Sequence, residues 1–327
     1  MSVHHQSLVG QVLFITGATS GIGLATLYQA VEQGAKVFYI ARDEEKLQTL
    51  QEKMRRMGYE TAYAVCDVAE KDQIERAVEL CLKTFGRIDT FINNAGITSY
   101  ETIEEIPLEE AKRVFDTNFW GVVNGSRAAL PALKESQGRL INIGSVLSEV
   151  ALPLQGIYSA SKFAVRGFTN ALRRELLATE PNVSVTLIIP SAINTSRRHE
   201  AYEKFGAIPP SHFVYSADVV ARAILKASTT PMREVRIGIA AYIFPWMERF
   251  LPKVQDRLLA NHFMENRQRR SLLEPLRRKE LFPGHVMKSS IVAELSYRKS
   301  FLASGVGAGA LFWLFLRKKG PSSHITT

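Results

Sequence analysis

A tyrosine and a lysine four residues apart are the strongest chemical signal in the chain. Tyr158 and Lys162 open a predicted helix, and positions i and i+4 of a helix share one face. A phenol with a pKa of about 10 is a poor acid–base group at neutral pH, and a neighbouring ammonium lowers that pKa toward the working range. Ser145 lies 13 residues before Tyr158, just after a predicted strand, where its hydroxyl can hydrogen-bond a carbonyl oxygen. Together the three side chains predict proton transfer at a carbonyl or alcohol oxygen.

A glycine-rich loop near the N-terminus predicts a nucleotide-binding turn. The segment Thr16–Gly23 follows the first predicted strand and has the pattern G-x-x-x-G-x-G. Glycines permit a tight turn and let main-chain amides approach a pyrophosphate at the positive end of the following helix. A purely structural turn is the alternative, and the strand–turn–helix context favours the dinucleotide.

The end of the second predicted strand bears on which dinucleotide binds. Enzymes that hold an unphosphorylated ribose usually place a carboxylate there, whereas this strand ends in Ala41 and is followed by Arg42. A guanidinium can pair with a 2′-phosphate, and Asp43 is better explained as the N-cap of the next helix. The pattern favours NADP(H) over NAD(H), although a solvated surface arginine is the alternative explanation of Arg42.

Seven short apolar runs alternate with longer helical patterns over residues 8–240. Strands without polar alternation, separated by helices, indicate a parallel sheet covered on both faces. The sequence therefore predicts an α/β fold with a doubly wound (Rossmann) parallel sheet. The predicted strands are 11–16, 36–41, 61–65, 90–93, 139–143, 184–189 and 235–239. The predicted helices are 22–33, 43–57, 70–85, 108–133, 157–177 and 217–227.

Composition sets the class of protein. Hydrophobic residues make up 46% and charged residues 22% of the 327 residues, which excludes a disordered, collagen-like or disulfide-rich chain. Cys66 and Cys81 are too few for a disulfide framework and are predicted to be reduced core residues. The first residues hold no long apolar run and are not a secretory signal, so we expect a cytoplasmic catalytic domain.

As a set, these motifs resemble the short-chain dehydrogenase/reductase family. The matching elements, in the family's order and at its spacings over residues 8–240, are the Thr16–Gly23 loop, Asp67-Val68, Asn93-Asn94-Ala95-Gly96, Asn118, Ser145 and the Tyr158–Lys162 motif. The resemblance implies an NAD(P)-dependent oxidoreductase that moves a hydride between the nicotinamide and a carbonyl or secondary alcohol carbon. Tyr158 would be the acid in reduction and the base in oxidation, Lys162 would hold the nicotinamide ribose, and Ser145 would orient the substrate oxygen.

The resemblance also implies contacts with the cofactor. Asn118 would hold a water that links Lys162 to solvent, and Asp67 would meet the adenine. The implied cofactor-binding residues are Gly17, Thr19, Ser20, Gly21, Ile22, Gly23, Arg42, Asp67, Val68, Asn94, Ala95, Gly96, Tyr158, Lys162, Pro190, Ile193 and Thr195. The implied catalytic residues are Asn118, Ser145, Tyr158 and Lys162, with Ser145 also binding substrate, and no metal site is predicted. Pro190-Ser191 stands where the family commonly has Pro-Gly, a local departure, and the family's habit of dimerising implies a homo-oligomer.

The last quarter of the chain differs in charge. Residues 1–248 hold 26 basic and 27 acidic residues, whereas residues 249–327 hold 15 and 5. We divide this part into a basic extension over 241–300, amphipathic at 242–263 and irregular from 265, and an apolar segment over 301–319. The uncharged run 301–316 would be about 24 Å long as a helix, short for a hydrocarbon core of about 30 Å. We favour contact with membrane lipid over a helix docked on the domain or on a partner subunit.

The sequence also bears on the substrate and on alternative functions. The long aromatic-rich stretch 191–216 predicts a lid over a small, apolar carbonyl or alcohol substrate. A catalytically silent, cofactor-binding regulatory or scaffold protein on the same fold is the alternative, and the complete catalytic set argues against it. The basic tail carries no recognised nucleic-acid module, so no nucleic-acid partner is expected.

Overall fold

One parallel sheet organises the part of the chain that the computed structural model describes, residues 7–180, 182–194, 214–261 and 286–287. Its strand order is β3-β2-β1-β4-β5-β6-β9. The strands are β1 (Val12–Thr16), β2 (Lys36–Ala41), β3 (Thr61–Val65), β4 (Thr90–Asn93), β5 (Arg139–Ile143), β6 (Ser184–Pro190) and β9 (Glu234–Ile237). The order reverses between β1 and β4, and a ligand crevice is expected beyond the carboxyl ends of the strands at such a point.

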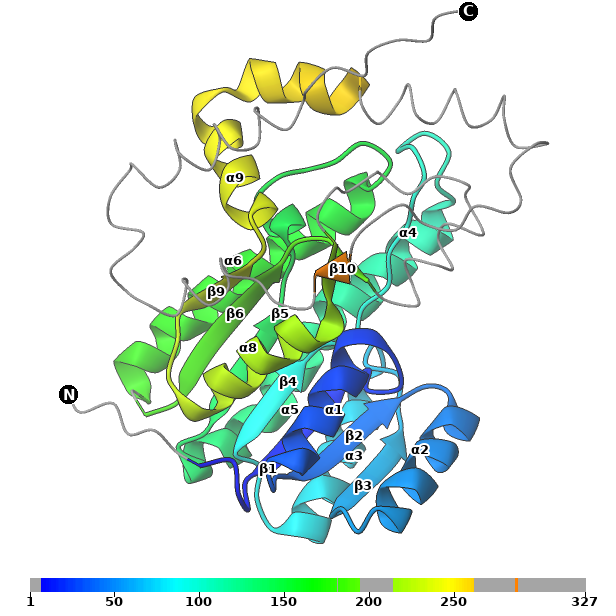
Figure 1. Ribbon diagram of the computed structural model, residues 1–327, viewed down its shortest axis with the longest axis vertical. Coiled ribbons are helices and arrows are strands. Elements are labelled where there is room, and N and C mark those ends of the chain that lie inside the picture. The colour runs from blue at the N-terminus through cyan, green and yellow to red at the C-terminus, as the bar shows by residue number, and fades with distance from the viewer. Residues whose placement is uncertain (1–6, 181, 195–213, 262–285, 288–327) are drawn as a thin grey trace, which may run out of the picture.

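Helices cover both faces of this sheet (Figure 1). One face carries α1 (Gly21–Glu32), α2 (Glu44–Arg56) and α8 (Ala217–Thr229), and the other carries α3 (Lys71–Phe85), α5 (Gly121–Ser136) and α6 (Gly156–Thr179). Alternate residues of β1 face the two layers: Leu13 and Ile15 join the first core, and Val12 and Phe14 join the second. Burial on both faces explains why the strands lack polar alternation.

The predicted α/β fold is confirmed, with most element ends within one or two residues. Asp43 caps α2 as predicted, because its carboxylate accepts from the Lys46 N–H at 3.0 Å. The last strand of the sheet, predicted over 235–239, begins one residue earlier and ends two residues earlier in the structure, as β9 (Glu234–Ile237). It ends at Ile237 because Gly238 takes a φ of 90°, which breaks the extended backbone.

The single helix predicted over 108–133 is wrong in its interior. The structure has α4 (Leu108–Phe115), a π-helical segment η1 (Asp116–Trp120) and then α5. A π segment widens the helix by one residue per turn and is frequent at functional sites. Here it contains Asn118, one of the predicted catalytic residues.

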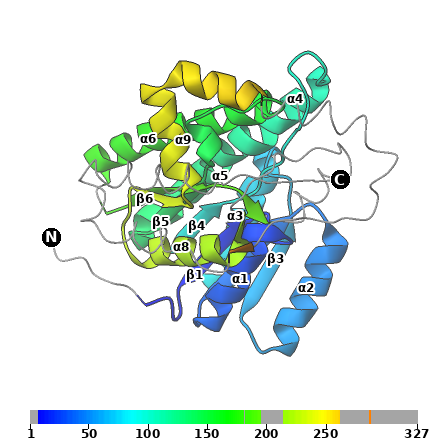
Figure 2. The ribbon, with the colours of Figure 1, turned by 45° about the horizontal axis from the view of Figure 1, so that its top comes forward.

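The described part of the stretch predicted to be amphipathic over 242–263 contains two helices. α9 (Ala240–Phe250) ends before Pro252, and residues 252–261 form the second helix. Proline has no N–H to continue a helix but is favourable in the first turn of the next one. In both views α9 lies at the opposite end of the molecule from α2 (Figures 1 and 2). No helix in the described ranges combines the length and apolar character needed to cross a membrane.

A second, three-stranded parallel sheet was not predicted. It consists of β7 (Ile193–Asn194), β8 (Val214–Ser216) and β10 (Val286–Met287), in the order β10-β8-β7. Strands of two or three residues are too short to give a periodic signal, and β10 is the described part of the stretch predicted to be irregular from residue 265. The remaining predictions for 195–213, 262–285 and 288–327, which include Thr195, the lid and the apolar segment, lie outside the described residues.

Candidate active site

The glycine loop connects β1 to α1 and leaves the amino end of that helix open. Gly17 and Gly21 have φ angles of 69° and 54°, which favour glycine. A Cβ built on Gly23 would lie 2.3 Å from the Gly17 carbonyl oxygen, so no side chain fits there. Ser20 is the N-cap but makes no side-chain cap hydrogen bond. The helix begins with Gly21 and Ile22, shortly after Thr19. The main-chain N–H groups at this helix end therefore fit a pyrophosphate.

Asn94 ties the end of β4 to this loop. Its Nδ2 donates to the carbonyl oxygens of Thr16 at 2.9 Å and Gly17 at 3.1 Å. The Thr16 hydroxyl accepts in return from the N–H groups of Asn94 and Ala95, both at 2.9 Å. The loop and the β4 end are thereby fixed at the point where the strand order reverses.

A cluster of charges lies beyond β2 and β3, where the adenosine end of a dinucleotide is expected. Arg42 Nη1 is 4.0 Å from Asp67 Oδ2, and the same oxygen is paired with Arg113 of α4. The Arg42 side chain is 53% exposed, so it is accessible to a ligand. Val68 packs against α5, since a Cβ on Gly121 would lie 2.6 Å from Val68 Cγ2. Arg113 was not predicted because its contact spans 46 residues of sequence.

Asn118, on η1, links three parts of the site from a fully buried position. Its Oδ1 accepts from the Ile97 N–H at 2.7 Å, and its Nδ2 donates to the Ile97 carbonyl at 2.9 Å. Nδ2 also donates to Ser161 Oγ at 3.0 Å, and that hydroxyl donates to the Tyr158 carbonyl at 2.7 Å. Ile97 and Ser161 were missed by sequence reasoning, although Ser161 falls inside the Tyr158–Lys162 motif.

Ser145 begins the short 3₁₀ helix η2 (Val146–Ser148) directly after β5. Its Oγ accepts from the Leu147 N–H, and its own N–H donates to Ser148 Oγ, both at 3.1 Å. These reciprocal bonds form a capping box. Ser145 is buried, and these bonds hold its hydroxyl in place.

Lys162 and Tyr158 meet at the carboxyl end of β5. The Lys162 ammonium is buried, lies 5.8 Å from the centroid of the Tyr158 ring and donates to the Ile143 carbonyl at 2.9 Å. A Cβ on Gly96 would lie 3.7 Å from Lys162 Nζ and 3.2 Å from Asn118 Oδ1. The structure thus brings Gly96, Asn118, Tyr158 and Lys162 together. The carbonyl that accepts from Lys162 belongs to Ile143, two residues before Ser145.

The remaining predicted residues lie at the neighbouring strand end. Pro190 is the last residue of β6, and Ile193 begins β7; both are buried. The Gly144 N–H donates to the Ile188 carbonyl at 2.8 Å, which aligns the ends of β5 and β6. Their position fits the nicotinamide end of a dinucleotide.

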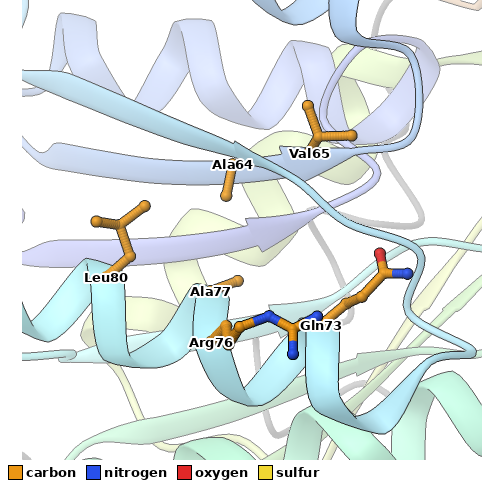
Figure 3. Close-up of a pocket in the computed structure, with 6 residues that line it drawn as sticks. All are labelled: Ala64, Val65, Gln73, Arg76, Ala77 and Leu80. Atoms are coloured by element: carbon orange, nitrogen blue, oxygen red, sulfur yellow. The ribbon is translucent and has the colours of Figure 1, made fainter.

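A separate pocket of about 220 Å³ lies between β3 and α3 (Figure 3). Its lining residues are Ala64, Val65, Gln73, Arg76, Ala77 and Leu80. One amide and one guanidinium among alkyl groups offer no acid–base pair, so we assign it no part in the reaction. Within the described ranges, no cluster of three His, Cys, Asp or Glu side chains could hold a metal ion.

Residues 11–205 match the short chain dehydrogenase family. The uncharacterized oxidoreductase YxnA of Bacillus subtilis is 38% identical over 259 residues, which cover 78% of this chain and 72% of YxnA. The chain belongs to the short-chain dehydrogenase family. It is therefore an NAD(P)-dependent oxidoreductase acting on CH–OH or C=O groups, as predicted.

Other relatives extend this comparison. The 11-beta-hydroxysteroid dehydrogenase-like 3 of Arabidopsis thaliana is 31% identical, covering 69% of this chain and 72% of its own. A short-chain dehydrogenase from Burkholderia phymatum in complex with NAD superposes with a TM-score of 0.69 at 22% identity, covering 76% of this chain and 96% of that one. An alcohol dehydrogenase from Thermococcus sibiricus complexed with 5-hydroxy-NADP gives 0.61 at 27% identity, covering 69% and 95%. A nicotinamide cofactor is supported.

Proposed function

We propose that this protein is an NADP(H)-preferring carbonyl reductase or alcohol dehydrogenase for small apolar substrates, with Tyr158 as the acid–base group. The observation that carries the proposal is the buried Lys162 ammonium beside the Tyr158 ring. Lysine is almost never fully buried unless it is paired or has a chemical role. A positive charge at this distance favours the phenolate and so prepares the phenol to exchange a proton.

The reaction would use four side chains of this chain, Ser145, Tyr158, Lys162 and Asn118. The bound cofactor would supply the hydride in reduction and accept it in oxidation. In reduction the Ser145 hydroxyl would donate a hydrogen bond to the substrate carbonyl oxygen, and the Tyr158 hydroxyl would give its proton to that oxygen. In oxidation the Tyr158 phenolate would accept the proton from the alcohol. Asn118 would keep Lys162 in place through Gly96 and Ile97, and hold the water that links Lys162 to solvent.

The cofactor would lie across the carboxyl ends of β1 and β4. The open amino end of α1 would take the pyrophosphate, Asp67 and Val68 the adenine, and Asn94 to Gly96 the centre of the dinucleotide. Lys162 would hold the nicotinamide ribose, with Pro190, Ile193 and Thr195 beside the nicotinamide. The fit is supported by the close packing of Gly23 against the loop, because a Cβ there would clash with the Gly17 carbonyl and displace the main chain that would meet the pyrophosphate.

NADP(H) preference is supported by the charges near Arg42. Asp43 is engaged as the cap of α2, and Arg113 offsets the charge of Asp67. The exposed Arg42 guanidinium, whose own contact with Asp67 is a long one at 4.0 Å, would then meet a 2′-phosphate. Arg42→Ala should weaken NADPH binding roughly 10–150-fold, the value of a charge-assisted bond of about 1.5–3 kcal/mol, and leave NADH binding nearly unchanged. A wild-type protein that binds NADH more tightly would contradict this preference.

Turnover of carbonyl probes tests the function directly. The purified full chain is mixed with NADPH and, in turn, 4-nitrobenzaldehyde, decanal, cyclohexanone and an 11-ketosteroid, the last because steroid dehydrogenases are among the relatives. Loss of NADPH absorbance with at least one probe is expected. Tight NADPH binding without turnover of any probe would instead support the silent regulatory protein.

Membrane contact, self-association and a cytoplasmic location are further parts of this proposal. The apolar segment 301–319 would contact lipid, supported by its uncharged run between basic clusters. Deleting residues 300–327 should abolish cosedimentation with anionic vesicles; a full chain that stays in the supernatant contradicts lipid contact.

Exposed Trp120 and Phe163 support a homo-oligomer. A monomeric mass in light scattering would refute it, and a fluorescent fusion tests the location.

A further inference from the structure

Four charged side chains form a partly buried network beside the turn that carries Ser145. Glu149 Oε1 lies 2.6 Å from Arg166 Nη1 and 2.7 Å from Arg236 Nη2, and Glu149 Oε2 also pairs with Arg236. Glu234 reaches both arginines at 3.3 Å. The four side chains are 11–24% exposed, so solvent screens these pairs less than ordinary surface pairs.

The network joins elements that are far apart in the sequence. Glu149 follows η2, Arg166 lies on α6, and Glu234 and Arg236 lie on β9. Arg236 Nη1 also donates to the Ala241 carbonyl at 3.0 Å, which attaches the first turn of α9. Figure 1 shows β9 at the edge of the sheet with α6 and α9 close by. Glu149 is the carboxylate that both arginines share most closely.

Glu149 and Ser145 belong to one rigid turn. The Ser148 N–H donates to the Ser145 carbonyl at 2.9 Å, and the Glu149 N–H donates to the Val146 carbonyl at 3.1 Å. The capping box adds two side-chain bonds at the Ser145 end. Because these bonds leave little freedom between the two ends, we expect a shift of the Glu149 main chain to move Ser145 as well.

Arg166 connects the same turn to the helix of the acid–base pair. It lies four residues after Lys162 and eight after Tyr158 on α6, about one and two turns away. We propose that Glu149 is a positioning residue that, through Arg166 and Arg236, fixes the Ser145 hydroxyl relative to Tyr158. This proposal rests on the proposed function. In the proposed reaction Glu149 touches neither substrate nor cofactor.

The test is a double-mutant cycle in the full chain, with 4-nitrobenzaldehyde and NADPH as probes. Glu149→Gln should lower kcat roughly 10–100-fold, the cost of misplacing a reacting group by about 1 Å. The Kd for NADPH should stay within about twofold, because the network does not touch the glycine loop. In a Ser145→Ala background, Glu149→Gln should lower kcat by less than about twofold further, since the group it positions is gone.

A control variant tests whether the loss of an ion pair by itself lowers kcat. Glu109→Gln removes a carboxylate from an exposed ion pair with Lys112 on α4, and should leave kcat within about twofold of wild type. Should Glu149→Gln not fold, Arg166→Lys replaces it in the cycle, because an ammonium cannot reach both Glu149 and Glu234 as the planar fork does.

Three results would overturn the inference. An unchanged kcat in Glu149→Gln, or a loss that multiplies with that of Ser145→Ala, means that Glu149 does not act through Ser145. If Arg166→Lys is used instead, an unchanged kcat or a multiplying loss likewise means that the network does not act through Ser145. A wild-type chain that reduces none of the probes refutes the proposed function, and this inference with it.

Discussion

Asn118→Ala is expected to lower kcat by more than its loss of folding stability explains. The variant loses three hydrogen bonds made by a fully buried amide, two to Ile97 and one to Ser161. At about 0.5–1.5 kcal/mol for each bond, the free energy of unfolding should fall by about 1.5–4.5 kcal/mol. The turn at Gly96, next to Lys162 Nζ, loses its support at the same time.

Turnover should therefore fall more than stability alone explains. Misplacement of Lys162 by about 1 Å would lower kcat roughly 100-fold at a temperature where the variant is still folded. Gln51→Ala is the matched control, because Gln51 makes three side-chain hydrogen bonds, to Tyr39 and Thr61, remote from the site.

The assay combines urea unfolding with initial rates of NADPH oxidation by 4-nitrobenzaldehyde. Both variants should unfold at lower urea concentration, and only Asn118→Ala should lose kcat. If the two variants lose stability alike and both keep near-normal kcat, Asn118 is a structural residue and the reasoning is refuted.

Two further predictions follow from the glycine loop and the thiols. Gly23→Ala places a Cβ 2.3 Å from the Gly17 carbonyl oxygen and should weaken NADPH binding in calorimetry by about tenfold or more. Gly167→Ala, at a position in α6 with open space around it, should keep the wild-type Kd. Equal NADPH affinities in the two variants would remove the loop from the cofactor site. Burial raises the pKa of the Cys66 and Cys81 thiols to about 12. At pH 8 both should be thiols, and a disulfide reagent should react with neither until the protein is unfolded; rapid labelling of the native chain would contradict this burial.

The sheet was predictable because its strands are continuous apolar runs between helices. Burial on both faces gives a strong signal, so the bounds of β2, β3, β4 and β5 were correct. The π segment was not predictable, because the pattern of apolar residues over 108–133 is the same for an unbroken helix. Its position depends on the Asn118 bonds to Ile97, which are set by tertiary structure.

The contact between Tyr158 and Lys162 was predictable because both residues belong to one motif. Tyr158 and Lys162 lie together because four residues make one helical turn. Arg113 and Glu149 could not be found in this way, since their partners Asp67 and Arg236 lie 46 and 87 residues away. Such contacts require knowledge of which elements become neighbours in the folded chain.

The most direct test of the account is the kcat of Tyr158→Phe. The change removes one hydroxyl, so NADPH binding and the unfolding midpoint should match those of the wild type. Turnover of 4-nitrobenzaldehyde should fall roughly 10²–10⁴-fold, the contribution of a positioned acid–base group. Near-normal kcat in this variant, with wild-type turnover established, would contradict the assignment of Tyr158 as the proton donor.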